Sequence, residues 1–232
     1  MKEKEKMVYQ VFQEISTDYD FLNNVISFNM HKLWKKNTLK RLEIQEGSKI
    51  LDVCCGTGDL SFMCANHKNR KNKVIGLDFS ENMLKVANKK KRKYQFNNLK
   101  FVHGNALELP FKDNTFDIVI IGFGLRNTPD YEKVIKEMKR VVKPKGRVAC
   151  LDTSQPTLPL YSQIYWLYFK YIMPFIGRLL SNHKKEYQWL NDSTKSFLSK
   201  KELKLLFEKV GLSDVKVVPY ALGAAALHIG KK

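Results

Sequence analysis

The segment Lys49-Ile-Leu-Asp-Val-Cys-Cys-Gly-Thr-Gly-Asp59 decides the fold, because an apolar strand passes into a glycine turn and then into a helix. Twenty residues after Gly58, Asp78 closes a second apolar run, Lys73-Val-Ile-Gly-Leu-Asp78. A carboxylate at this separation can receive a ribose whose nucleotide is held by the first loop. The two strand ends are therefore predicted to converge on one nucleotide-like ligand.

Strands and helices are predicted to alternate from this segment onward. Short apolar runs predict strands at 49–53, 74–78, 99–103, 116–122 and 147–152, and two closing strands near 215–220 and 224–229. Helical patterns follow Asp59 and occupy 80–93, 131–142 and 199–210. The pattern at 131–142 is expected to be stopped by Pro144 and Gly146. This order predicts an α/β fold, in which a mostly parallel seven-stranded sheet with a reversed last strand carries helices on both faces.

One domain of 232 residues is expected, with two segments that cover the site. Residues 1–45 read as an N-terminal helical cap, and residues 155–197 as an aromatic covering insertion. The aromatic stretch 161–177 is compatible with three roles: lining an apolar tunnel, contacting lipid, or packing in the protein core. Lys170 and Pro174 interrupt it, so it is not expected to span a membrane.

The composition points to a cytoplasmic protein with a strongly basic surface. The charged N-terminus lacks the apolar core of a secretory signal, and the four cysteines have neither disulfide nor zinc spacing, so no metal is expected. The formal net charge of +18 would attract nucleic acid or an anionic membrane surface, although a solvated lysine-rich face explains it equally well.

The glycine loop departs from the dinucleotide pattern. That pattern requires Gly or Ala three residues after its second glycine, whereas Ser61 stands there. After the third predicted strand, the Asn105 side chain can accept a hydrogen bond from an adenine amino group, and the Ala106 N–H can donate to a ring nitrogen. Together these strand ends resemble those of S-adenosylmethionine-dependent methyltransferases of Rossmann-like fold. In this comparison Gly56 and Gly58 let the backbone approach the ligand.

Further motifs make the resemblance more specific. They are Ile26-Ser-Phe-Asn-Met-His-Lys-Leu-Trp34, Ile120-Ile-Gly-Phe-Gly-Leu-Arg-Asn127, Cys150-Leu-Asp-Thr-Ser-Gln-Pro156 and Ala224-Ala-Ala-Leu-His-Ile-Gly230. With the glycine loop, they resemble the ubiquinone/menaquinone C-methyltransferase family, and most closely its bacterial demethylmenaquinone branch. The resemblance runs from about residue 8 to residue 230. It implies that Thr57, Asp78, Asn105 and Ala106 contact S-adenosylmethionine.

The implied reaction methylates a ring carbon of a prenylated naphthoquinol, the last step of menaquinone biosynthesis. Arg126 follows the fourth strand and stays protonated, so we expect it to orient the quinol oxygen and favour its anion, or else to form a salt bridge. Asn127 is expected to hold Arg126 or the quinol, or to cap the next helix. Asp20, acting through a water, is favoured over His31 as the proton acceptor.

Other classes fit the sequence less well. A nucleic-acid methyltransferase of the amine-modifying kind would carry an Asn/Asp-Pro-Pro-aromatic tetrad where Gly122–Asn127 stands, so no nucleic-acid partner is expected. An NAD-linked oxidoreductase is disfavoured, because Ser61 departs from the dinucleotide-binding pattern. A non-catalytic scaffold is disfavoured as well, because such a protein would have no need to keep Asp78 and Arg126. The expected partners are a quinol and, peripherally, an anionic membrane on its cytoplasmic face, and a homodimer is left open.

Overall fold

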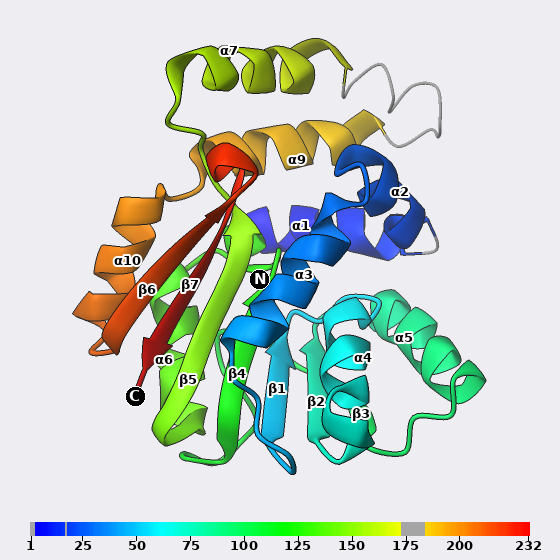
Figure 1. The fold of residues 1–232 in the computed structure, drawn as a ribbon. Coiled ribbons are helices and arrows are strands. Elements are labelled where there is room, and N and C mark those ends of the chain that lie inside the picture. The colour runs from blue at the N-terminus through cyan, green and yellow to red at the C-terminus, as the bar shows by residue number, and fades with distance from the viewer. Residues whose placement is uncertain (1–2, 17, 173–183) are drawn as a thin grey trace.

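The computed structural model describes residues 3–16, 18–172 and 184–232, whose strands form one seven-stranded sheet in the order β3-β2-β1-β4-β5-β7-β6 (Figure 1). The strands are β1 (Lys49–Val53), β2 (Lys73–Asp78), β3 (Leu99–His103), β4 (Phe116–Gly122), β5 (Val142–Thr153), β6 (Ser213–Tyr220) and β7 (Ala225–Lys231). Strand β7 runs antiparallel to both of its neighbours, and the remaining pairs are parallel. The predicted fold class, including the reversed last strand, is confirmed.

Three of the described helices begin at side-chain caps that the sequence supplies. The Ser80 hydroxyl accepts from the backbone N–H of Met83, the Asp130 carboxylate accepts from that of Lys133, and Ser199 forms a capping box with Glu202. The described helices are α1 (Glu3–Glu14), α2 (Tyr19–Ile26), α3 (Met30–Arg41), α4 (Asp59–Asn66), α5 (Glu81–Lys93), α6 (Tyr131–Val141), α7 (Pro159–Leu167), α9 (Lys184–Ser196) and α10 (Lys200–Lys209). Shorter helical turns are η1 (Lys68–Arg70), η2 (Leu125–Asn127), η3 (Tyr168–Ile172) and η4 (Ala221–Gly223).

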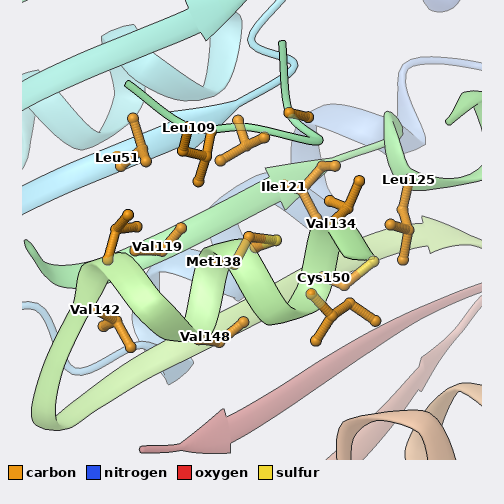
Figure 2. Close-up of a cluster of buried hydrophobic side chains, with 14 of the residues drawn as sticks. Leu51, Leu109, Val119, Ile121, Leu125, Val134, Met138, Val142, Val148 and Cys150 are labelled. Carbon is orange, nitrogen blue, oxygen red and sulfur yellow. The ribbon is translucent and has the colours of Figure 1, made fainter. Parts of the chain in front are cut away.

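The sheet separates two hydrophobic cores because successive strand residues point to opposite faces. In β4, Val119 and Ile121 join the core under α6 and α10, whereas Ile118 and Ile120 join the core under α3 and α4. Figure 2 shows the first of these cores, with Val119 and Ile121 beside Val134 and Met138 of α6. Both strand faces are buried, which explains why the central strands read as continuous apolar runs.

The junction between α6 and β5 differs from the prediction. Helix α6 ends at Val141, and β5 starts at Val142 instead of residue 147. Val142 pairs with Phe116 while Arg147 pairs with Ile118, so the intervening residues bulge out of the register. Pro144 and Gly146 therefore lie within the irregular start of the strand, where a missing backbone donor is tolerated.

The N-terminal helices pack over the end of the sheet that carries the glycine loop (Figure 1). Helix α1 is fixed on α5, because Asn82 donates to the Gln13 side chain from its backbone N (3.1 Å) and to the Gln13 carbonyl from Nδ2 (3.2 Å). The Tyr168 hydroxyl donates to the Ile26 carbonyl at 3.1 Å, which joins η3 to α2. Of the predicted aromatic insertion, residues 173–183 lie outside the described residues.

Candidate active site

The loop after β1 is shaped by three left-handed residues. Cys54, Gly56 and Gly58 have φ values of 54°, 56° and 88°. The Cys55 N–H donates to the Leu77 carbonyl at 3.0 Å, which ties the loop to the end of β2. A Cβ on Gly56 would meet nothing closer than Tyr19 at 3.8 Å, so the backbone there is open to a ligand. A Cβ on Gly58 would lie 2.6 Å from the Phe101 ring, so this glycine is required by packing.

Asp78 links the two strand ends as the sequence predicted. Its Oδ2 accepts from the Gly56 N–H at 2.8 Å and its Oδ1 from the Ser80 N–H at 2.9 Å. Burial raises the pKa of Asp78, while these backbone donors oppose the rise. Each carboxylate oxygen retains a further lone pair, so the side chain can still accept hydrogen bonds from a ribose diol.

An open pocket, here called the smaller cavity, lies beside Asp78 and holds about 810 Å³ of empty space, part of it open solvent. Four of the six predicted cofactor residues line it, namely Gly56, Asp78, Asn105 and Ala106. The Asn105 Oδ1 accepts from the Leu107 N–H at 2.9 Å, which fixes the orientation of its amide. Thr57 instead lines the neighbouring cavity, and Gly58 lines neither.

A second open pocket, the larger cavity, adjoins the first and holds about 1380 Å³ of empty space, part of it open solvent. The two share lining residues, namely Tyr19, Cys54, Gly56, Gly122 and Phe123. The wall of the larger cavity is mostly apolar and aromatic, with contributions from Phe28, Trp34, Tyr161, Ile164, Tyr165 and Tyr168. Burial raises the pKa of Tyr19 at the junction, so its phenol remains protonated at neutral pH.

Four charged side chains fasten the N-terminal helices to the glycine loop. The Thr57 hydroxyl donates to Asp20 Oδ1 at 2.5 Å, and Lys90 of α5 donates to Asp20 Oδ2 and, at 3.3 Å, to Asp59. Lys35 of α3 donates to the other Asp59 oxygen at 3.2 Å. Although burial opposes ionisation, these two lysines hold the pKa of Asp59 below its usual value. The network crosses from α2 and α3 to the loop, so cap and loop are held together.

Two further titratable groups face the larger cavity. His31 is buried, and its Nε2 lies 3.0 Å from the Asn24 Oδ1, an acceptor, so the proton is assigned to Nε2 and Nδ1 carries a lone pair. Burial, with the charge of Lys35 adding to it, lowers the pKa of His31 to about 4. Burial raises the pKa of Asp52 to about 7, even though the Ser61 hydroxyl donates to it at 2.6 Å.

Arg126 lies in the wall of the larger cavity and forms the salt bridge that was its alternative role. Its Nη1 donates to Asp152 Oδ1 and to the Phe123 carbonyl, both at 2.7 Å, and its backbone N–H donates to Asp152 Oδ2 at 3.2 Å. The Arg126 and Asp152 side chains are 8% and 1% exposed. The buried Nε has no hydrogen-bond partner in the described part of the chain. The guanidinium is thus held rigidly and keeps unused donor capacity.

Asn127 lines the smaller cavity and contacts α9. Its Oδ1 accepts from Trp189 Nε1 at 2.9 Å, and its Nδ2 donates to the Phe123 carbonyl at 3.3 Å. The alternative role of Asn127, capping of the next helix, is wrong, because Asp130 caps α6. The Phe123 carbonyl also binds Arg126, so the two side chains are positioned by one acceptor.

The whole chain, residues 1–232, matches the model of the ubiE/COQ5 methyltransferase family. The chain belongs to this family. Demethylmenaquinone methyltransferases of Bacillus cereus (strain AH187) and Bacillus anthracis (strain A0248) are each 54% identical to this ubiE/COQ5 methyltransferase over 229 residues, which are 99% of this chain and 97% of theirs.

Solved structures show the same fold at much lower identity. A SAM-dependent methyltransferase from Thermotoga maritima superposes with a TM-score of 0.70 at 20% identity, covering 97% of this chain and 99% of that one. One from Aquifex aeolicus gives a TM-score of 0.61 at 22% identity, with 85% and 88% covered. The Rossmann-like methyltransferase fold of this family member is therefore shown, and the protein is a methyltransferase.

The sequence reasoning missed several residues of the site of this methyltransferase. Lys90 belongs to the run Lys89-Lys-Lys-Arg-Lys93, a pattern that predicts a solvated helix end, yet its side chain turns toward Asp20 and Asp59. Lys35 is buried, although helical spacing gave no sign of it. Asp152 belongs to one of the motifs in the sequence, but only the pairing of β4 with β5 places it beside Arg126.

Proposed function

We propose that this methyltransferase transfers the methyl group of S-adenosylmethionine to a ring carbon of a prenylated naphthoquinol, converting demethylmenaquinol to menaquinol in the last step of menaquinone biosynthesis. The observation that carries the proposal is the junction of two cavities, one beside the Asp78 carboxylate and one lined by aromatic side chains. The 54% identity to proteins named demethylmenaquinone methyltransferase supports the choice of quinol.

The smaller cavity fits S-adenosylmethionine. Asp78 offers its remaining lone pairs to the ribose hydroxyls, and Asn105 with the Ala106 N–H selects adenine. Gly56 leaves room for the methionine part, Thr57 borders it from the larger cavity, and Gly58 fixes the turn. When bound, the cofactor supplies an electrophilic methyl group on a positively charged sulfur. The proposal requires no metal, and the described residues contain no group of three possible metal ligands.

The larger cavity receives the quinol ring. Phe123, Gly56 and Tyr19 line both cavities, so a ring in the larger one abuts whatever occupies the smaller one. The aromatic wall excludes water and fixes the ring plane, and orientation of this kind can contribute roughly 7 to 11 kcal/mol. The protein's main task is therefore alignment of the acceptor carbon.

Arg126 is proposed to favour the quinol anion. A ring carbon becomes a good nucleophile only when the neighbouring hydroxyl loses its proton, and a fixed guanidinium at the cavity wall stabilises the resulting oxyanion. Asp152 and the Phe123 carbonyl hold the guanidinium in place before the substrate arrives. Asn127 shares the Phe123 carbonyl and is proposed to position this guanidinium, while it lines the smaller cavity and not the one that receives the quinol.

Two side chains are candidates for the proton acceptor. Asp20 accepts from Thr57 and Lys90, so it requires a bridging water to reach a quinol in the larger cavity. His31 lines that cavity in its neutral form, with Nδ1 as acceptor. The pH–rate profiles of Asp20→Asn and His31→Gln separate them, because only loss of the true acceptor removes the acidic limb of the profile. Unchanged profiles in both variants would eliminate this part of the proposal.

The test of the proposed function is direct. The purified protein is incubated with S-adenosylmethionine carrying a radiolabelled methyl group and with reduced demethylmenaquinones of several tail lengths, beside a benzoquinol control. We expect label in the naphthoquinol product and a rate that depends on reduction of the quinone. Absence of label from every quinol, with the cofactor still bound, would instead favour a binding protein without turnover.

We also propose peripheral contact with an anionic membrane on its cytoplasmic face, since a prenylated substrate resides in lipid and the chain carries a net charge of +18. Within the residues that the structure describes, no helix has both the length and the apolar character needed to cross a bilayer. The cytoplasmic location and the homodimer remain predictions.

A further inference from the structure

Helix α7 and the adjoining turn η3 carry a stripe of apolar side chains that are exposed in the described part of the chain. Leu160, Ile164, Leu167 and Tyr171 recur at intervals of four, three and four residues, and they are 72%, 57%, 58% and 57% exposed. No residue of α7 is classed as buried, and Figure 1 shows the helix at the outer margin of the molecule, beyond the end of β5. An apolar stripe of this length is unusual on a water-facing helix.

The same helix forms part of the mouth of the larger cavity. Ile164 belongs to the stripe and also lines the cavity, together with Tyr165 and Tyr168 from the inner side of the segment. Opposite them, the exposed Phe28 lies 5.9 Å from the Tyr168 ring, centroid to centroid. Phe28 has a left-handed φ of 49°, a costly conformation for a bulky residue. The apolar surface is thus continuous from the outside of α7 into the cavity.

The two chain segments that build this surface carry basic residues and no acidic ones. The sequence contains no Asp or Glu between Asp152 and Glu186, and none between Asp20 and Glu43. Lys170 lies on η3, and its Nζ is 5.0 Å from the centroid of the Tyr171 ring. Lys32 and Lys36 are exposed on α3. A second copy of the chain brought to this face would oppose basic groups to basic groups, whereas an anionic lipid surface would complement them.

We infer that the α7–η3 stripe docks on an anionic lipid bilayer and opens the larger cavity toward the acyl chains. Leu160, Leu167 and Tyr171 enter the headgroup boundary, in the manner of an interfacial amphipathic helix. The prenyl tail then stays in lipid while the quinol ring moves past Ile164 and Phe28 into the cavity. This inference rests on the proposed function for the identity of the tail, but the docking itself is measurable without turnover.

The test compares single Leu→Glu variants of the full chain that carry the same charge change. Leu160→Glu and Leu167→Glu alter the stripe without touching either cavity, and Leu205→Glu is the matched control, because Leu205 is 62% exposed on α10. Binding is measured by flotation with phosphatidylcholine vesicles that contain or lack phosphatidylglycerol, over a range of NaCl concentrations. We expect each stripe variant to bind about tenfold more weakly to the anionic vesicles, and Leu205→Glu to bind like the wild type.

Each outcome of this test is decisive. Equal vesicle binding by all variants, or equal binding to neutral and anionic vesicles at every salt concentration, overturns the inference. A change from dimer to monomer in the stripe variants on sedimentation, with vesicle binding unaltered, identifies the stripe as a subunit interface and also overturns it. Methyl transfer to a short-tailed quinol without vesicles is measured in parallel. It should be unchanged in the stripe variants, and its absence in the wild type would refute the proposed function alone.

Discussion

Replacement of Asp152 by asparagine removes the counter-ion of Arg126 while leaving the side-chain shape almost unchanged. Asp152 is 1% exposed and accepts from Arg126 Nη1 at 2.7 Å and from the Arg126 backbone at 3.2 Å. Removal of one partner of a buried pair leaves the other charge without compensation and typically costs about 3 to 5 kcal/mol. With an m-value of about 3 kcal/mol/M, the midpoint of urea-induced unfolding should fall by about 1 to 2 M.

The matched control is Asp113→Asn. Asp113 pairs with Arg140 at a similar distance of 2.8 Å, but its side chain is 66% exposed, so solvent screens the charge and the expected cost is about 0 to 1 kcal/mol. Denaturation is followed by far-ultraviolet circular dichroism, and methyl transfer is measured on the fraction that remains folded. A loss at Asp152 no larger than the loss at Asp113 would refute the view that a buried, rigidly held guanidinium lies at the cavity wall.

Three further predictions follow from single residues. Burial lowers the pKa of His31 to about 4 in the folded protein, whereas the unfolded chain titrates near 6.5. Between these two pH values only the unfolded chain binds the proton, so the free energy of unfolding falls by at most about 3 kcal/mol as the pH drops from 6.5 to about 4. Urea titrations of His31→Gln should show a correspondingly flatter pH profile, and a profile identical to that of the wild type would count against the assignment. Gly58→Ala should lower the free energy of unfolding, measured by thermal denaturation, by about 1 to 3 kcal/mol, because φ is 88° there and the new Cβ would clash with the Phe101 ring. The control is Gly47→Ala, where φ is 80° and no atom lies within 4 Å of the new Cβ, so the cost should be clearly smaller. Equal costs in the two variants would refute the packing argument. Burial raises the pKa of Asp52 to about 7, so this carboxyl is partly protonated at pH 7. Uptake of a positively charged cofactor in the adjoining cavity should favour its anion and release a fraction of a proton; calorimetry in buffers of different ionisation enthalpy measures the release, and its absence would disprove the prediction.

The sequence predicts the strands well because both faces of the central strands are buried, which leaves continuous apolar runs such as those of β1 and β4. It also places Asp78 at the loop, since a fixed separation along the chain determines that contact. Local pattern could not show that Pro144 sits in a strand, because the bulge depends on pairing with β4.

The polar contacts of the site were harder to predict. Lys90 looked like part of a solvated basic run, and its inward orientation depends on where α2 and α4 place Asp20 and Asp59. The partner of Arg126 is 26 residues away on the next strand, and only the sheet order brings it near. Long-range charge pairing leaves no periodic trace in the sequence, so the sequence predicts that the two strand ends meet but does not predict the ion pairs around them.

The central claim is that Asp78 holds a nucleoside-bearing methyl donor in the smaller cavity, and equilibrium dialysis with labelled S-adenosylmethionine measures this most directly. A carboxylate that accepts two ribose hydroxyls contributes on the order of 3 to 6 kcal/mol, because hydrogen bonds to charged groups are worth about 1.5 to 3 kcal/mol each. Asp78→Ala, checked by circular dichroism to be folded, should therefore bind at least about 100-fold more weakly than the wild type and the Asp113→Asn control. Equal affinity in all three proteins would contradict the account.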